Sequence, residues 1–87
     1  MIKMGDLIKA MHEYVEEMIE KRQESNLELL DILKKIVEKH PELRFGQILI
    51  IAGVLEMEKY GGVVDPFNEE SFRCLQRVKW KLKEKDL

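Results

Sequence analysis

Carboxylates are the side chains in this sequence whose types and spacing could most readily do chemistry. They fall in two groups with helical spacing, namely Glu16, Glu17 and Glu20, followed by Glu28 and Asp31. Carboxylate oxygens one helical turn apart can hold Mg²⁺, which can in turn bind the phosphates of a substrate. Only seven residues separate Glu20 from Glu28, too few to turn one helix back against another. The two groups could therefore face each other only if a second subunit supplied one of them.

These groups resemble the Glu-Glu-x-x-Glu and Glu-x-x-Asp motifs of the all-helical nucleotide pyrophosphohydrolases. The resemblance implies a Mg²⁺-dependent hydrolase in which the five carboxylates bind the metal. Glutamate-rich surface helices produce the same spacing without any metal. We therefore prefer an acidic, solvent-exposed helix face and keep the hydrolase as an alternative.

The other residues that could bind a metal or act as a nucleophile are isolated. His12 and Glu16 are four residues apart and could form one edge of a metal site, but two ligands do not complete it. His40 precedes Pro41 and is expected to satisfy carbonyl groups at a helix end. Cys74 is the only cysteine and is expected to be a buried thiol that packs as a small apolar side chain. We expect no cofactor and no catalytic residue.

Basic residues near the C-terminus form a candidate nucleic-acid site, because cations bind phosphates and an exposed tryptophan can stack on an unpaired base. The candidates are Arg73, Arg77, Lys79, Trp80 and Lys83. Helical spacing distributes their charges around the helix and not along one stripe. We therefore prefer a solvated terminal helix and keep a nucleic-acid-binding module as the first alternative.

Composition predicts a small all-α protein. The chain has 87 residues, of which 37% are charged, and it contains only two prolines. A chain of this length forms a single domain, expected over residues 1–87, whose small core would gain stability from self-association. The single cysteine and the lack of an apolar leader or a bilayer-length apolar run favour a cytoplasmic protein without membrane contact.

Hydrophobic periodicity predicts four helices in a bundle-like domain, at about 5–22, 26–39, 44–59 and 69–85. The first break depends on Ser25 and Glu28, which have the spacing of a capping box. A single helix that continues through this segment is the alternative. The third helix is expected to end at Gly61 and Gly62, and a buried strand is the rival assignment for its isoleucine-rich start.

Charge is distributed unevenly along the chain. Residues 13–31 carry a net charge of −5 and residues 73–85 carry +5. Opposite fields of this size predict antiparallel docking of the two segments, within one subunit or between two.

The segment Pro41-Glu42-Leu43-Arg44-Phe45-Gly46-Gln47, followed by Asp65-Pro66-Phe67 and Glu69-Glu70, resembles a group of small bacterial and phage proteins. The shared motif is proline, an acidic residue, then Leu-Arg-x-Gly-Gln. The resemblance implies a helical domain found in prophage-rich contexts, and no activity can be transferred from the group.

The residues of this segment also predict a structural clasp. Arg44 and Gln47, three apart on one helix face, are expected to meet three carboxylates, those of Asp65, Glu69 and Glu70. A small-anion pocket lined by Arg44 and Gln47 is the alternative. Gly46 and Gly53, seven apart, are expected to allow another helix to approach closely.

An apolar stripe near the N-terminus predicts an oligomer interface. Its residues are Met4, Leu7, Ile8, Met11, Val15 and Met18. Four short helices cannot easily cover this stripe together with the other apolar faces, so we expect a homodimer or higher oligomer. The preferred function is non-enzymatic: self-association and binding of another macromolecule, with an unidentified protein as partner.

Overall fold

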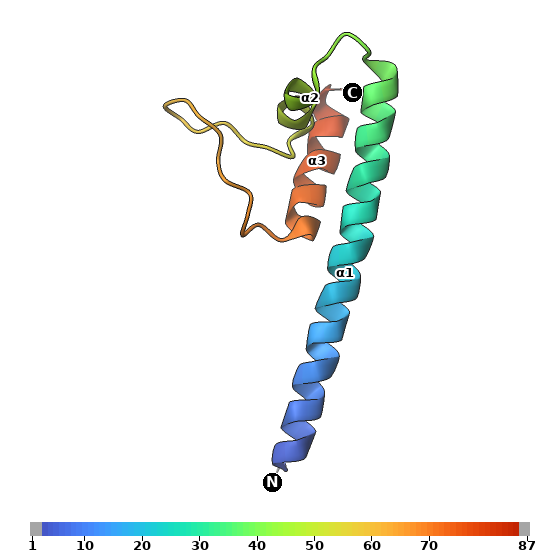
Figure 1. Ribbon diagram of the computed structural model, residues 1–87, viewed down its shortest axis with the longest axis vertical. Coiled ribbons are helices and arrows are strands. Elements are labelled where there is room, and N and C mark those ends of the chain that lie inside the picture. The colour runs from blue at the N-terminus through green and yellow to red at the C-terminus, as the bar shows by residue number, and fades with distance from the viewer. Residues whose placement is uncertain (1–2, 86–87) are drawn as a thin grey trace.

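One long helix organises the molecule. The computed structural model describes residues 3–85 and contains, within them, α1 (Met4–Lys39), α2 (Phe45–Ala52) and α3 (Ser71–Lys85). Figure 1 shows α2 and α3 on the C-terminal half of α1, while the N-terminal half projects alone. The all-α class is confirmed and the number of helices is corrected to three. Residues 1–2 and 86–87 of the expected domain lie outside the described residues.

The expected break between the first two helices is wrong, because α1 is continuous over 36 residues. Lys21, Arg22 and Gln23 all sustain a helix, so no residue in this segment ends it. Ser25 is not an N-cap but a buried residue in the middle of α1, only 5% exposed. Its neighbours Arg22 and Glu28 both contact the α3 region, so Ser25 lies where a small side chain lets α3 approach.

The core lies entirely beside the C-terminal half of α1. Ile36 of α1 packs with Ile48 and Ala52 of α2, and partly buried residues, among them Leu82 of α3, cover this cluster. On α3 the buried residues are Cys74, Leu75 and Val78, at the three- and four-residue steps of one helix face.

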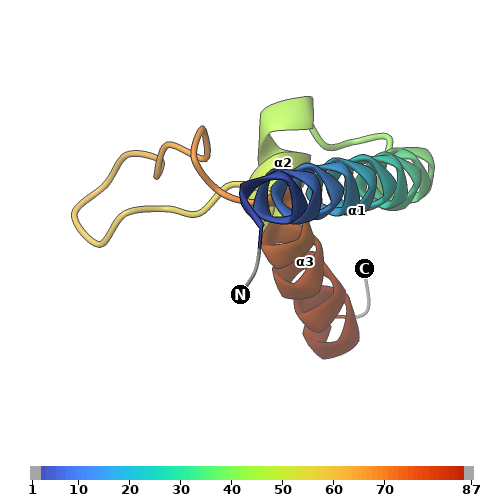
Figure 2. The ribbon, with the colours of Figure 1, turned by 90° about the horizontal axis from the view of Figure 1, so that it is seen from below.

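The third helix expected at 44–59 ends early, because Gly53 adopts φ 89° and caps α2. The Gly53 amide donates to the Ile50 carbonyl and the Leu55 amide to the Leu49 carbonyl, each at 3.1 Å, so two carbonyls at the helix end are satisfied. The strand alternative is also wrong for residues 45–52, which are helical. Beyond Gly53 the chain forms a short hairpin with a single bridge between Met57 and Val63. Figure 2 shows this segment extending away from the helices.

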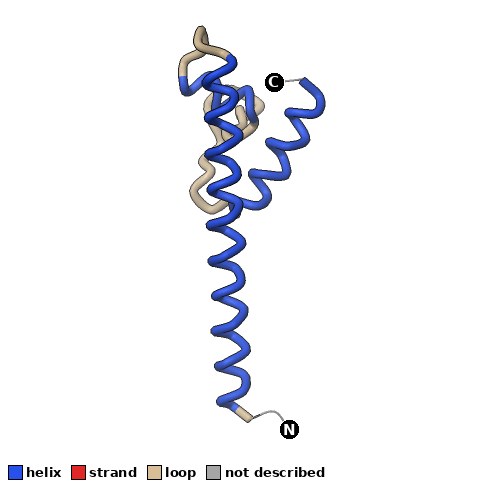
Figure 3. The backbone as a smooth tube through the Cα atoms, turned by 90° about the vertical axis from the view of Figure 1, so that its right-hand side faces the viewer, coloured by secondary structure: helices blue, strands red, loops and turns tan. Residues whose placement is uncertain are grey.

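The expected antiparallel docking of the acidic and basic segments is wrong within the chain. Arg22 pairs with Glu70 just before α3, and further along both helices Lys79 pairs with Glu28. Contacts that ascend together along α1 and α3 mean that these helices run in the same direction. In Figure 3 α3 starts beside the middle of α1 and diverges from it towards its C-terminal end. The long connection at 53–70 makes this parallel arrangement feasible.

Gly46 and Gly53, both expected to let another helix approach closely, differ in how much space surrounds them. A Cβ atom on Gly53 would lie 2.7 Å from Cδ of Lys81 in α3, whereas a Cβ on Gly46 would meet nothing within 4 Å. The expectation is therefore confirmed for Gly53 and wrong for Gly46.

Gly53→Ala should destabilise the fold and Gly46→Ala should not. Alanine at position 53 must adopt a left-handed backbone, which costs about 1–2 kcal/mol before the contact with Lys81 is counted. Gly46→Ala should be neutral or stabilising by up to about 1 kcal/mol, since alanine is the better helix former and Gly46 lies in the open first turn of α2. Urea denaturation followed by circular dichroism measures both; equal effects would contradict the role of Gly53.

Candidate functional site

We call the N-terminal half of α1, residues 4–20, the arm. Its apolar face is exposed: Met4 is 76% and Met11 66% exposed. Among residues 3–85 this is the longest continuous run of exposed apolar side chains on one helix, and its members are Met4, Leu7, Ile8, Met11, Tyr14, Val15 and Ile19, with half-buried Met18 at its end. A shallow hollow lies over the middle of this face, beside Met11 and Tyr14.

The arm face continues the face that α1 buries in the core. Steps of four and three lead from Met4 to Met18 and then through Arg22 to the buried part of α1. The positions on these steps are Met4, Ile8, Met11, Val15, Met18, Arg22, Ser25, Leu29, Ile32 and Ile36. From Ser25 onwards α2 and α3 cover this stripe, the start of α3 reaches half-buried Met18, and the stripe from Met4 to Val15 is exposed. Pairing of the expected interface residues with a second copy stays a prediction.

The candidate metal ligands lie along one helix. Because α1 is continuous, Glu16, Glu17 and Glu20 cannot face Glu28 and Asp31 within one chain. Glu28 instead pairs with Lys79 at 2.6 Å, and Asp31 with Lys35 at 3.1 Å. No three His, Cys, Asp or Glu side chains in residues 3–85 lie close enough together to hold a metal ion. The hydrolase would require its second motif from another subunit.

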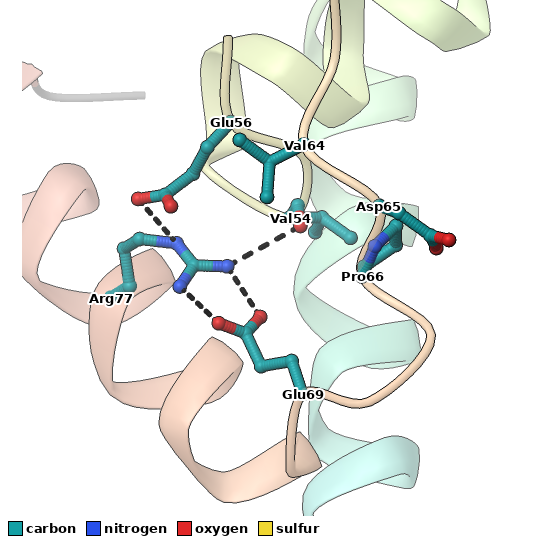
Figure 4. A pocket seen from close by; sticks show the side chains of 7 residues that line it. All are labelled: Val54, Glu56, Val64, Asp65, Pro66, Glu69 and Arg77. Carbon is teal, nitrogen blue, oxygen red and sulfur yellow. Dashed lines mark hydrogen bonds and ion pairs between the residues drawn. The ribbon is translucent and has the colours of Figure 1, made fainter. Parts of the chain in front are cut away.

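The best-defined polar cluster centres on Arg77 of α3 (Figure 4). Its Nε donates to the Gly53 carbonyl at 2.7 Å, and its two terminal nitrogens donate to the Glu69 carboxylate at 2.7 Å each. Glu56 lies 3.3 Å from Nε, and the Val54 carbonyl accepts a longer bond of 3.4 Å. The side chain is 20% exposed and borders a cavity of about 90 Å³. Every nitrogen of the guanidinium has a partner, so the cluster is built to hold the chain together.

The electrostatics of this cluster follow from the bidentate pair. Hydrogen bonds from Arg77 lower the pKa of Glu69, and the same bonds raise the pKa of Arg77. Burial raises the pKa of the neighbouring Cys74 thiol. Cys74 is buried on the core side of α3, as expected from the sequence. Its thiol is thereby held in the protonated form, which is the less reactive one.

The expected clasp is wrong in its partners. Gln47 accepts a bond from the Arg44 amide at 2.8 Å and caps the start of α2, and Asp65 accepts one from the Phe67 amide at 2.9 Å. The two glutamates bind other arginines: Glu69 binds Arg77, and Glu70 binds Arg22. Sequence reasoning missed Arg22 and Arg77 as structural residues.

A signal for Arg77 was available in the sequence. Arg77 lies three residues after Cys74 and one before Val78, which places it at the edge of the apolar face of α3. Long cations at such positions can bury their stems and aim the charged group at nearby acceptors.

Two of the candidate nucleic-acid residues form ion pairs within the chain. Arg77 is engaged in its cluster, and Lys79 pairs with Glu28. Lys79, Lys83 and Trp80, which is 60% exposed, line one shallow hollow, and Arg73 is exposed outside it. The five residues therefore form no single basic surface.

The two histidines are far from these clusters along the chain. His12 lies on the exposed arm. His40 ends α1 through its amide, which donates to the Ile36 carbonyl at 2.9 Å, but its ring faces Glu42 and not the terminal carbonyls. The expected role of its side chain is therefore wrong, whereas its place at the helix end is confirmed.

Arg77→Gln should destabilise the fold by about 2 kcal/mol, because charged hydrogen bonds are lost and buried acceptors lose their donor. Arg73→Gln, on the exposed side of the same helix, is the matched control and should change stability little. Urea midpoints at equal protein concentration provide the comparison. A similar loss in both variants would show that Arg77 has no special role.

Glu69→Gln should weaken the acid sensitivity of the fold. The pKa of Glu69 lies below its ordinary value of 4.5 in the folded state, so its stabilisation is complete above about pH 4.5 and is lost as pH falls through the lowered pKa. The variant should be less stable at neutral pH and should lose less stability on acidification. Unfolding free energies measured from pH 6 to about pH 3, with Glu13→Gln on the arm as control, test this; parallel curves for the variant and the wild type would contradict it.

Comparison with known proteins identifies no relative: no family model, no curated protein and no solved structure matches this chain. Within residues 3–85 no helix is long and apolar enough to cross a membrane, α1 included. The arm face and the Arg77 cluster are the two features of residues 3–85 that bear on function.

Proposed function

We propose that this chain is a non-enzymatic helical protein that acts through self-association and binds another macromolecule in its assembled form. The observation that carries the proposal is the arm face, which continues the core face of α1 and is exposed from Met4 to Val15. The Arg77 cluster supports the proposal indirectly, because its donors are used to hold the fold.

Exposure of the arm face has an energetic cost. Burial of a large apolar side chain is worth about 1.5–3 kcal/mol, so a partner that covers even part of the face would be strongly favoured. A helix of this length without tertiary contacts is also only marginally stable in water. Association therefore stabilises both the apolar surface and the helical state of the arm.

A second copy of the chain is the partner we assign to the arm face. The face is long, narrow and apolar, with acidic residues such as Glu13 and Glu17 outside it. Two such helices can pack side by side through residues at steps of three and four, as in a coiled coil. We further propose a cytoplasmic, phage-related setting, supported by the free thiol of Cys74 and by the resemblance of residues 41–47.

Met11→Lys should convert the protein from a self-associated form to a monomer, because it places a charge at the centre of the arm face. Gln23→Lys adds the same side chain to an exposed position of the same helix, outside the arm, and should leave association intact. Sedimentation velocity at tens of micromolar distinguishes a 10.3 kDa monomer from larger species. A wild-type protein that sediments as a monomer would overturn the proposal.

A further inference from the structure

We infer that two arms pair antiparallel, with a two-fold axis that passes beside Met11. The inference rests on the proposed self-association and specifies how the second copy is placed. It depends on three observations: the symmetry of the arm face, the distribution of charge along the arm, and the position of α2 and α3 at one end of α1 (Figure 1).

The apolar pattern of the arm is symmetric about Met11. Apolar residues lie three, four and seven positions before Met11 and at the same distances after it. An antiparallel two-fold axis therefore places apolar residues opposite apolar residues from Met4 to Met18, while Ile19 at the end of the face lies opposite Lys3. The opposed pairs are Ile8 with Tyr14, Leu7 with Val15, and Met4 with Met18. Such a self-complementary patch is what a two-fold interface requires.

Charge favours this orientation over the parallel one through the fields of the two segments, because the charged side chains themselves lie outside the apolar face. Residues 3–9 carry Lys3, Asp6 and Lys9, a net charge of +1, whereas residues 13–20 carry four glutamates and a net charge of −4. A parallel pair would place the two −4 segments side by side. An antiparallel pair places each −4 segment beside a +1 segment, and it also aligns the helix dipoles favourably.

The length of the arm stripe and the surroundings of its two ends are compatible with an antiparallel pair. The stripe from Met4 to Met18 is about 21 Å long. It stops at Arg22, whose guanidinium is held by Glu70 at 2.8 and 2.9 Å. Beside Met18 lies an open groove between α1 and the start of α3, lined in part by Tyr14 and Phe72. An antiparallel partner would bring its Met4 to this groove, and the α2 and α3 segments of the two copies would lie at opposite ends of the pair.

Disulfide formation between single introduced cysteines tests the orientation. The wild-type chain is the control, since its one thiol, Cys74, is buried. We expect Met11→Cys to form a linked dimer on mild oxidation. Met4→Cys and Met18→Cys should not link alone, because like positions would be about 21 Å apart and a disulfide spans only about 4–7 Å between Cα atoms. A mixture of Met4→Cys with Met18→Cys, one of them carrying a size tag, should give a linked heterodimer.

Each outcome decides a different point. Efficient self-linking of both Met4→Cys and Met18→Cys would establish a parallel pair and overturn this inference, while the proposed self-association would stand. A self-associated protein in which neither Met11→Cys alone nor the mixture links would also overturn it. A wild-type protein that sediments as a monomer would overturn the proposed function itself. Circular dichroism of each variant confirms that the helical content is retained.

Discussion

A single guanidinium joins the parts of the chain that the core does not hold. Arg77 projects from α3 to the Gly53 carbonyl just beyond the end of α2, to Glu56 at the base of the hairpin and to Glu69 ahead of α3. The 18 residues that separate α2 from α3 contain one isolated bridge and few buried side chains. Fixing both ends of this segment through one side chain removes much of its freedom. The buried neighbours Cys74 and Val78 hold Arg77 in position, so the packing of α3 and the polar cluster stabilise each other.

With α3 anchored in this way, α1 is divided into two parts with different surroundings. The C-terminal part is covered by α2 and α3, and it provides the stable helical segment from which the rest of α1 extends. Helix propagation adds one hydrogen bond per residue without a new nucleation cost. The arm can therefore be helical without a core of its own. Its apolar face, in line with the core face, then presents an ordered surface to a partner.

The sequence predicted the helical class well, because glutamate, lysine and leucine favour helices wherever they are placed. It misplaced boundaries that depend on a single local choice. Ser25 and Glu28 have the spacing of a capping box, yet nothing in Lys21-Arg22-Gln23 ends a helix. Ser25 is instead buried within α1, where its small side chain leaves room for the α3 region. The apolar run at 48–55 predicts a longer helix, but Gly53 takes a left-handed conformation and ends α2 at Ala52. Such choices depend on tertiary contacts that a local pattern does not contain.

The polar contacts were harder still to predict than the boundaries. Opposite charge predicts that acidic and basic segments attract each other, but it does not give the direction in which two helices run. Here the connection at 53–70 returns the chain to the middle of α1, and Glu28 then meets Lys79 in a parallel pair. In the same way, the sequence does not specify which arginine pairs with Glu69 and which with Glu70. The partner of each was decided by which arginine the fold placed within reach, Arg77 for one and Arg22 for the other.

The two halves of the α1 stripe also differ in the kind of apolar residue they use. The covered half contains Leu29, Ile32 and Ile36, and the β-branched isoleucines have restricted rotamers and specify one packing. At every seventh position the arm has Met4, Met11 and Met18, whose flexible side chains adapt to different neighbours. Between these methionines the arm stripe keeps the β-branched Ile8 and Val15. In the proposed pair, Ile8 and Val15 would therefore restrict how the two arms pack, and the methionines would adapt to that packing.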